Sequence, residues 1–240
     1  MIREWLQFYI ISNLFIYPCQ FGGLKQRSTT DAEVALTHFI HSGWIKNLTT
    51  SILAFTIAQF YLSLNYQLLS CIINKARLDH KVFTFFKDYL VRRKTRYLWN
   101  NFISSFCSID VGVGQKSALS LILSTLYLSP ILHIFEKCLK TLKIPISIIL
   151  FIDDGLFISQ NKSILHSNTN LFCSYNIMFS LLSKFGLIME YRKTEVFHFS
   201  RSQEAFNPLP LDLSTLEGPI LLSKELWWYL RFIFNRKLSF

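Results

Sequence analysis

The sequence has few cysteines, and none of them is arranged to bind a metal. The five cysteines lie far apart and form neither a Cys-x-x-Cys pair nor a cluster with histidine. They are Cys19, Cys71, Cys107, Cys138 and Cys173. This scattered, odd set argues against a zinc site and fits buried thiols in a reducing compartment.

Charged residues are also scarce, and the negative ones are the scarcer. Only 17% of the 240 residues are charged while 51% are hydrophobic, which excludes an intrinsically disordered chain. The 25 basic residues outnumber the 15 acidic ones, giving a net charge of +10. This excess favours a polyanionic partner, either a nucleic acid or an anionic membrane surface.

The sequence contains no visible internal repeat, no low-complexity tract and no clear membrane span. The apolar N-terminal segment, residues 1–19, is interrupted by Gln7, Ser12 and Asn13, which leaves too short a run to cross a bilayer. A secretory signal stays open as an alternative reading of this segment, although no small-residue cleavage site follows it.

What is present is an alternation of helical and strand patterns. A capped helix is expected near residue 28, with Ser28, Thr29 or Thr30 as its cap. Long helices are expected at about 118–141 and 169–186, the second ending in a left-handed cap at Gly186. The other expected elements are a buried strand in 51–64, amphipathic helices in 65–78 and 80–91, a ribbon from 92–100 and 104–114, a hairpin in 146–161, short strands in 187–191 and 195–200, and a strand pair in 227–240. This order predicts an α+β fold with a mostly antiparallel sheet.

The stretch "LFIDDGLFIS", residues 150–159, places Asp153 and Asp154 inside a run that otherwise indicates buried β-structure. A surface hairpin that turns at Asp-Asp-Gly would need no chemistry, because Asp-Gly is a favoured hairpin turn. The alternative is a hairpin tip that presents two carboxylates to Mg²⁺, a hard cation that prefers oxygen ligands. Phosphoryl-transfer enzymes use two such ions, about 4 Å apart.

A second segment, "GVGQKSALSLILSTLYLSPILHIFEK", precedes the hairpin. Together the two resemble a reverse transcriptase of a non-LTR (LINE-type) retrotransposon. In that family the segment reads Gly-x-x-Gln-Gly-x-x-x-Ser-Pro-x-Leu and the hairpin reads aromatic-x-Asp-Asp. Further stretches fall in the family order: "GGLKQRSTTDA", "AFTIAQFYLSLN", "YLVRRKTRY", "FGLIMEYRKTEVFHFS" and "YLRFIF". The resemblance covers residues 20–240 and rests on the order of these segments as much as on any one of them.

The resemblance implies roles for particular residues. Asp153 and Asp154 would bind the metal, and Lys193 would lie near the incoming triphosphate as a charge neutraliser or proton donor. The residues implied on the template and nucleotide side are Tyr61, whose ring would screen the sugar 2′ position, Gln115, Ser120, Lys25 and Arg27. Arg92, Arg93, Lys94 and Arg96, interleaved with Tyr97 and Trp99, suit a strand that follows a nucleic-acid backbone, and a solvated basic face is the alternative.

The sequence departs from the family pattern at its most important position. The family has an aspartate, the third metal-binding carboxylate, where this chain has Thr56, and no Asp or Glu occurs from Val34 to Leu78. Three further substitutions agree with decay: Lys116 for a glycine, Leu121 for a proline and Arg231 for the glycine of the "YLRFIF" stretch.

The resemblance therefore predicts a polymerase palm, residues 51–240, with partial fingers at 20–50 and no thumb. Mg²⁺ or Mn²⁺ is the expected cofactor, with weakened binding. An RNA template, a DNA primer and a deoxynucleoside triphosphate are the expected partners, and no stable membrane partner is expected. A catalytically impaired reverse transcriptase remnant is the first hypothesis. The alternatives are a weakly active RNA-directed DNA polymerase and a nucleic-acid-binding module without catalysis.

Overall fold

The computed structural model describes residues 2–91, 93–109, 111–114, 117, 119–201, 208, 210–214 and 219–238. The described helices are α1 (Ile2–Ser12), α2 (Thr29–Ile45), α3 (Phe60–Ser63), α4 (Tyr66–Lys75), α5 (His80–Leu90), α6 (Ser120–Leu142), α7 (Ile164–Lys184) and the 3-10 turn η1 (Tyr191–Lys193). The described strands are β1 (Thr49–Ala58), β2 (Arg93–Thr95), β3 (Leu98–Trp99), β4 (Phe102–Ile103), β5 (Cys107–Ile109), β6 (Ile146–Phe151), β7 (Asp154–Asn161), β8 (Ile188–Met189), β9 (Glu195–Phe199), β10 (Leu211–Asp212), β11 (Ile220–Leu221), β12 (Leu226–Tyr229) and β13 (Phe232–Asn235).

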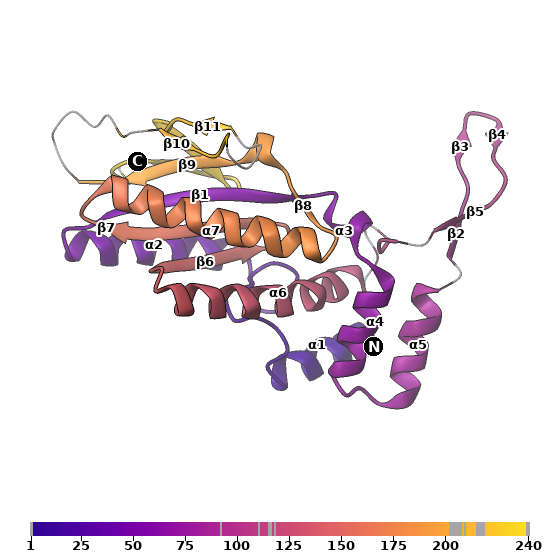
Figure 1. The fold of residues 1–240 in the computed structure, drawn as a ribbon. Coiled ribbons are helices and arrows are strands. Elements are labelled where there is room, and N and C mark those ends of the chain that lie inside the picture. The colour runs from indigo at the N-terminus through magenta and orange to yellow at the C-terminus, as the bar shows by residue number, and fades with distance from the viewer. Residues whose placement is uncertain are drawn as a thin grey trace.

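A central antiparallel sheet is built around β1 (Figure 1). β1 pairs with β7 on one edge, and β6 pairs with the far side of β7. On its other edge β1 pairs with β9 and then, over its last two residues, with β8. The predicted α+β fold with an antiparallel sheet is confirmed.

Strand alternation gives the sheet two buried faces. On one face Phe55 of β1 stacks on Phe157 of β7, with ring centroids 4.6 Å apart, and Phe135 of α6 packs against Phe157. α6 and α7 cover this face. The opposite face is covered by α2 and by the β12–β13 hairpin, whose Trp227 packs on Phe197 of β9.

Most predicted elements are present at the expected places. Ser28 caps α2 and exchanges hydrogen bonds with Asp31 in a capping box, and Gly186 has the predicted left-handed conformation, with φ of 74°. Among the larger boundary differences, α7 begins at Ile164, earlier than expected, and the first strand ends at Ala58, where the chain turns into α3.

The N-terminal segment forms α1, which buries Leu6 and Ile10 in the core shared with α6. By length and composition α6 is apolar enough to cross a membrane, but 61% of the residues in its apolar window are buried among the other elements. That burial is typical of a central core helix. The division into residues 1–19, 20–50 and 51–240 stays a prediction.

The turn between β12 and β13 shows why glycine would be favoured at the position of Arg231. Tyr229 pairs with Phe232, so Leu230 and Arg231 form a two-residue turn. Both have positive φ, 49° and 76°, as a type I′ turn requires. Glycine adopts this conformation without strain, so Arg231 occupies a position at which the family's glycine is physically preferred.

Candidate active site

The two adjacent aspartates lie at the tip of the β6–β7 hairpin. Phe151 pairs with Asp154, which leaves Ile152 and Asp153 as the two turn residues. The prediction that Asp-Asp-Gly forms the hinge is therefore correct for Asp153 and wrong for Asp154 and Gly155, which belong to β7. Ile152 has a φ of 62°, an unusual conformation for a β-branched residue that costs of order 1–3 kcal/mol.

Thr56 lies directly across the strand pair from Asp154. Its hydroxyl donates a hydrogen bond of 2.8 Å to Asp154 Oδ1. Two backbone hydrogen bonds fix the surroundings: the Ile57 amide donates to the Asp153 carbonyl and the Glu190 amide donates to the Thr56 carbonyl, at 2.9 and 2.8 Å. Thr56, where the resemblance implies a third carboxylate, therefore faces Asp154 directly.

The charges at the hairpin tip affect the pKa values of Asp153 and Tyr61. Burial, and then the nearby charge of Asp154, raises the pKa of the Asp153 carboxyl above its ordinary value, while the ammonium of Lys193 in η1 opposes that rise. Burial, and then the charge of Asp153, raises the pKa of the Tyr61 phenol. The structure thus brings Asp153, Asp154, Lys193 and Tyr61 into one neighbourhood.

The loop before α2 lies against the hairpin. The Phe21 amide donates to the Leu150 carbonyl at 2.7 Å, and a Cβ on Gly22 would approach Ile152 Cγ1 to 2.5 Å. Arg27 Nη1 donates to the carbonyls of Pro18 and Gln20, so this guanidinium holds the loop in place. Lys25 is exposed in the same loop. The phosphate contacts of Lys25 and Arg27 stay predictions.

The remaining predicted residues lie farther along the chain. Ser120 is buried at the start of α6 and donates a hydrogen bond of 2.5 Å to the Gly114 carbonyl. Arg93 donates to the Gly112 carbonyl at 2.9 Å. Lys94 and Arg96 lie on or beside β2, which pairs with β5 as the predicted ribbon. The predicted site residues Gln115 and Arg92, and Lys116 as well, lie outside the described residues.

Two residues near the aspartates were not among the predicted site residues. Tyr229 of β12 is buried, and its phenolic oxygen has no hydrogen-bond partner among the described residues. Burial, and then the charge of Asp154, raises the pKa of this phenol. Ser124 of α6 faces Tyr61 and partly offsets the rise in its pKa. Tyr229 begins the "YLRFIF" stretch, so the sequence carried a signal for it; nothing in the sequence singled out Ser124.

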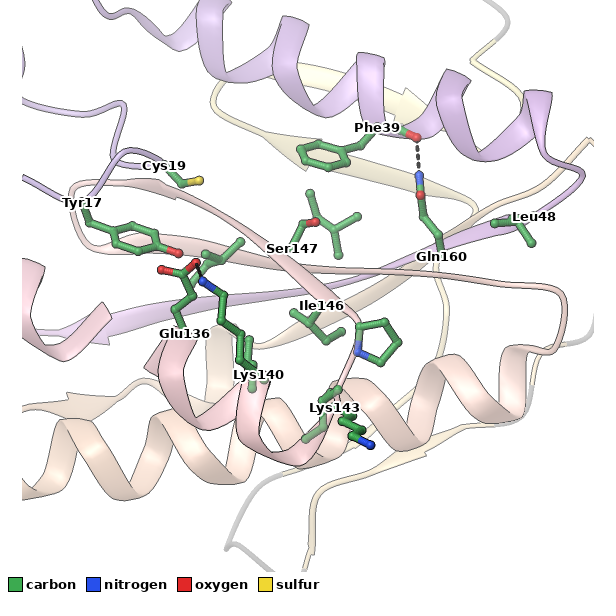
Figure 2. Close-up of a pocket in the computed structure, with 15 residues that line it drawn as sticks. Tyr17, Cys19, Phe39, Leu48, Glu136, Lys140, Lys143, Ile146, Ser147 and Gln160 are labelled. Carbon is green, nitrogen blue, oxygen red and sulfur yellow. Dashed lines mark hydrogen bonds and ion pairs between the residues drawn. The ribbon is translucent and has the colours of Figure 1, made fainter. Parts of the chain in front are cut away.

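Within the part of the chain that the structure describes, no three His, Cys, Asp or Glu side chains gather where they could hold one metal ion. A cavity of about 650 Å³ lies elsewhere, between α2, the end of α6 and the β6–β7 strands (Figure 2). Tyr17, Cys19 and the ion-paired Glu136 and Lys140 line one side of it. Among the predicted site residues that the structure describes, none lines this cavity, so it is separate from the aspartates.

An antiparallel sheet that presents adjacent aspartates at a hairpin tip, backed by two long helices, defines a polymerase palm. The sequence profile for "Reverse transcriptase (RNA-dependent DNA polymerase)" matches residues 7–226. The chain belongs to this reverse transcriptase family, whose members generally use divalent metal ions. No curated protein sequence matches the chain.

Solved structures with a similar fold include telomerases of two Candida species. Apo telomerase from Candida tropicalis, truncated from the C-terminal domain, has a TM-score of 0.68 at 14% identity, over 99% of this chain and 44% of that one. The same species' telomerase with a fragment of telomeric RNA has a TM-score of 0.64 at 16% identity, over 85% and 35%. Telomerase from Candida albicans gives 0.56 at 14% identity, over 88% and 36%. At these identities the likeness shows the fold alone, and the chain spans less than half of each.

Proposed function

We propose that the chain is a reverse transcriptase palm with partial fingers in which RNA-directed DNA synthesis is lost or greatly slowed. The observation that carries the proposal is the Thr56 hydroxyl, which stands 2.8 Å from Asp154 Oδ1 where a third carboxylate is expected. The family match supports the ancestral activity, and Thr56 supports its impairment.

The impairment follows from charge. Two divalent ions held about 4 Å apart repel each other, and carboxylates at the site offset that repulsion. Thr56 is neutral, and its hydroxyl hydrogen occupies a lone pair of Asp154 that would otherwise face a cation. Asp153 and Asp154 therefore suit one divalent cation better than two. Removing one electrostatic group from an active site costs about 10²–10³ in rate, and we expect at least that here.

The other site residues keep positions that suit polymerisation. Lys193 lies close enough to Asp153 to affect its protonation, so it could neutralise a triphosphate bound at the tip. The ring of Tyr61 would screen the sugar 2′ position. Ser120 would act indirectly, because its hydrogen bond ties the start of α6 to the Gly114 carbonyl.

Primer extension on poly(rA)/oligo(dT) with Mg²⁺ or Mn²⁺ tests this proposal. We expect extension by the Thr56→Asp variant at least a hundredfold above that of the unaltered chain. Thr56→Asn is the matched control, because it has the shape of aspartate without the charge and should stay as inactive as the parent. Asp154→Asn combined with Thr56→Asp should abolish the gain. Equal extension by the unaltered chain and Thr56→Asp would show that Thr56 does not impair the site.

A nucleic-acid-binding module without catalysis is the second candidate, supported by the net charge of +10. It predicts binding to primer–template that weakens steeply with salt and does not change when Mg²⁺ is removed. If no variant extends a primer while binding of this kind persists, this candidate replaces the first.

We also propose that the chain derives from a LINE-type element, on the order of its sequence segments. Sequencing the source genome tests this: dispersed related copies are expected, some with an aspartate at the Thr56 position. A single locus without relatives would contradict the proposed origin.

A further inference from the structure

Residues 93–109, here called the arm, project from the body as a two-part antiparallel ribbon (Figure 1). β2 pairs with β5 near its base, and β3 pairs with β4 at its tip. The tip is apolar and uncovered: Trp99 is 76% exposed and its cross-strand partner Phe102 is 65% exposed. Tyr97, Leu98, Ile103 and Phe106 are exposed as well. A ribbon with this much exposed apolar surface marks a binding surface.

The base of the arm is fixed beside the candidate active site. The Val113 amide donates to the Tyr61 carbonyl at 2.6 Å, and the Gly112 amide donates to the Leu64 carbonyl at 2.8 Å. Arg93 adds hydrogen bonds to the Gly112 carbonyl and to the Tyr66 hydroxyl. Because Tyr61 lies near Asp153, the arm extends from the end of the sheet that carries the aspartates.

The charge of the arm indicates what it binds. Residues 93–109 contain Arg93, Lys94 and Arg96 and no Asp or Glu. Lys94 on β2 and Arg96 just beyond it are both exposed, and the Arg96 guanidinium lies over the Phe106 ring, 5.5 Å from its centroid. A surface that interleaves cations with exposed rings and carries no carboxylate complements a polyanion with planar groups.

We propose that the arm binds single-stranded nucleic acid, with unpaired bases stacked on Trp99 and Phe102 and phosphates held by Lys94 and Arg96. This inference rests on the proposed function for the nature of the substrate, and it adds a second binding surface that contacts the unpaired template beyond the primer. Single strands are favoured over duplex because only unpaired bases expose their faces for stacking.

Fluorescence anisotropy with labelled oligo(rU), and with a duplex of the same length, tests the arm over a range of KCl concentrations. We expect Trp99→Ala and Phe102→Ala each to weaken single-strand binding about tenfold and to leave duplex binding nearly unchanged. Lys94→Ala should reduce the slope of log affinity against log salt by about 0.7. Phe8→Ala is the matched control, because Phe8 of α1 is 72% exposed and lies outside the arm. Circular dichroism confirms that each variant folds.

Three results would overturn the inference. The first is an unaltered affinity for oligo(rU) in both ring variants, and the second is no binding of oligo(rU) by the parent chain. The third is a dimer of the parent chain, measured by light scattering, that becomes a monomer in Trp99→Ala. The arm would then be a contact between copies of this chain.

Primer extension by Thr56→Asp separates the arm inference from the polymerase proposal. If Thr56→Asp extends the primer while the ring variants bind oligo(rU) normally, only the arm inference fails. If it fails while those variants lose single-strand affinity, only the polymerase proposal fails.

Discussion

Replacing Thr56 by aspartate should destabilise the metal-free protein and make it depend on Mg²⁺. The parent has a hydrogen bond of 2.8 Å from the Thr56 hydroxyl to an ionised acceptor, Asp154, of a kind that contributes about 1.5–3 kcal/mol. An aspartate at this position would lose that bond and face a like charge. Cross-strand partners have side chains about 5 Å apart, at which two carboxylates repel by about 3 kcal/mol at an effective dielectric constant of about 20.

Urea denaturation of Thr56→Asp and Thr56→Asn at pH 7 measures this repulsion. Asparagine has the same shape and no charge, so the difference between the two variants isolates the charge. In EDTA we expect Thr56→Asp to be about 2–3 kcal/mol less stable than Thr56→Asn, allowing for partial exposure of the pair. Mg²⁺ at a hundred times its dissociation constant should restore about 2.7 kcal/mol to the aspartate variant. Equal stability of the two variants in EDTA would refute the placement of Thr56 opposite Asp154.

Three further predictions concern stability. Arg231→Gly should raise the free energy of unfolding by about 1 kcal/mol, because φ of 76° favours glycine, whereas Arg231→Ala should give no gain in the same urea titration. His198 is buried with its pKa lowered by burial from 6.5 to about 4, so the unfolded chain binds this proton first and stability should fall as pH drops from 6.5 towards 4. His198→Gln should lack that loss in thermal melts across this range. The raised pKa of Asp153 has the opposite linkage: its ionisation opposes folding, so Asp153→Asn should gain stability at neutral pH and lose the gain below pH 3.8. An unchanged melting temperature at pH 7 would contradict the burial of that carboxylate beside Asp154.

Much of the fold could be predicted because its signals are local. Apolar runs on both sides of Asp-Asp-Gly indicated the hairpin, and the Ser-Thr-Thr run from Ser28 marked the start of α2. The family segments then placed Asp153, Asp154, Tyr61 and Lys193 together, although nothing in any one segment shows that they meet.

The position of the hairpin turn could not be predicted, because its cause is a tertiary contact. Asp-Gly favours a turn in isolation, but the space where a Cβ on Gly155 would lie is filled by the Phe55 ring, 2.2 Å away. Glycine is therefore needed inside β7, and Ile152 takes the positive φ of the turn instead. The hydrogen bonds of Arg27 are likewise set by the path of the loop before α2, which local sequence does not specify.

Counting the divalent ions bound at the site tests most directly the proposal that Thr56 weakens metal binding. Electron paramagnetic resonance can count Mn²⁺ bound per chain in the presence of primer–template and a chain-terminating nucleotide. We expect at most one tightly bound ion at the Asp153–Asp154 tip of the parent chain and two in Thr56→Asp. Two tightly bound ions in the parent, both lost on Asp154→Asn, would contradict the proposed impairment of the site by Thr56.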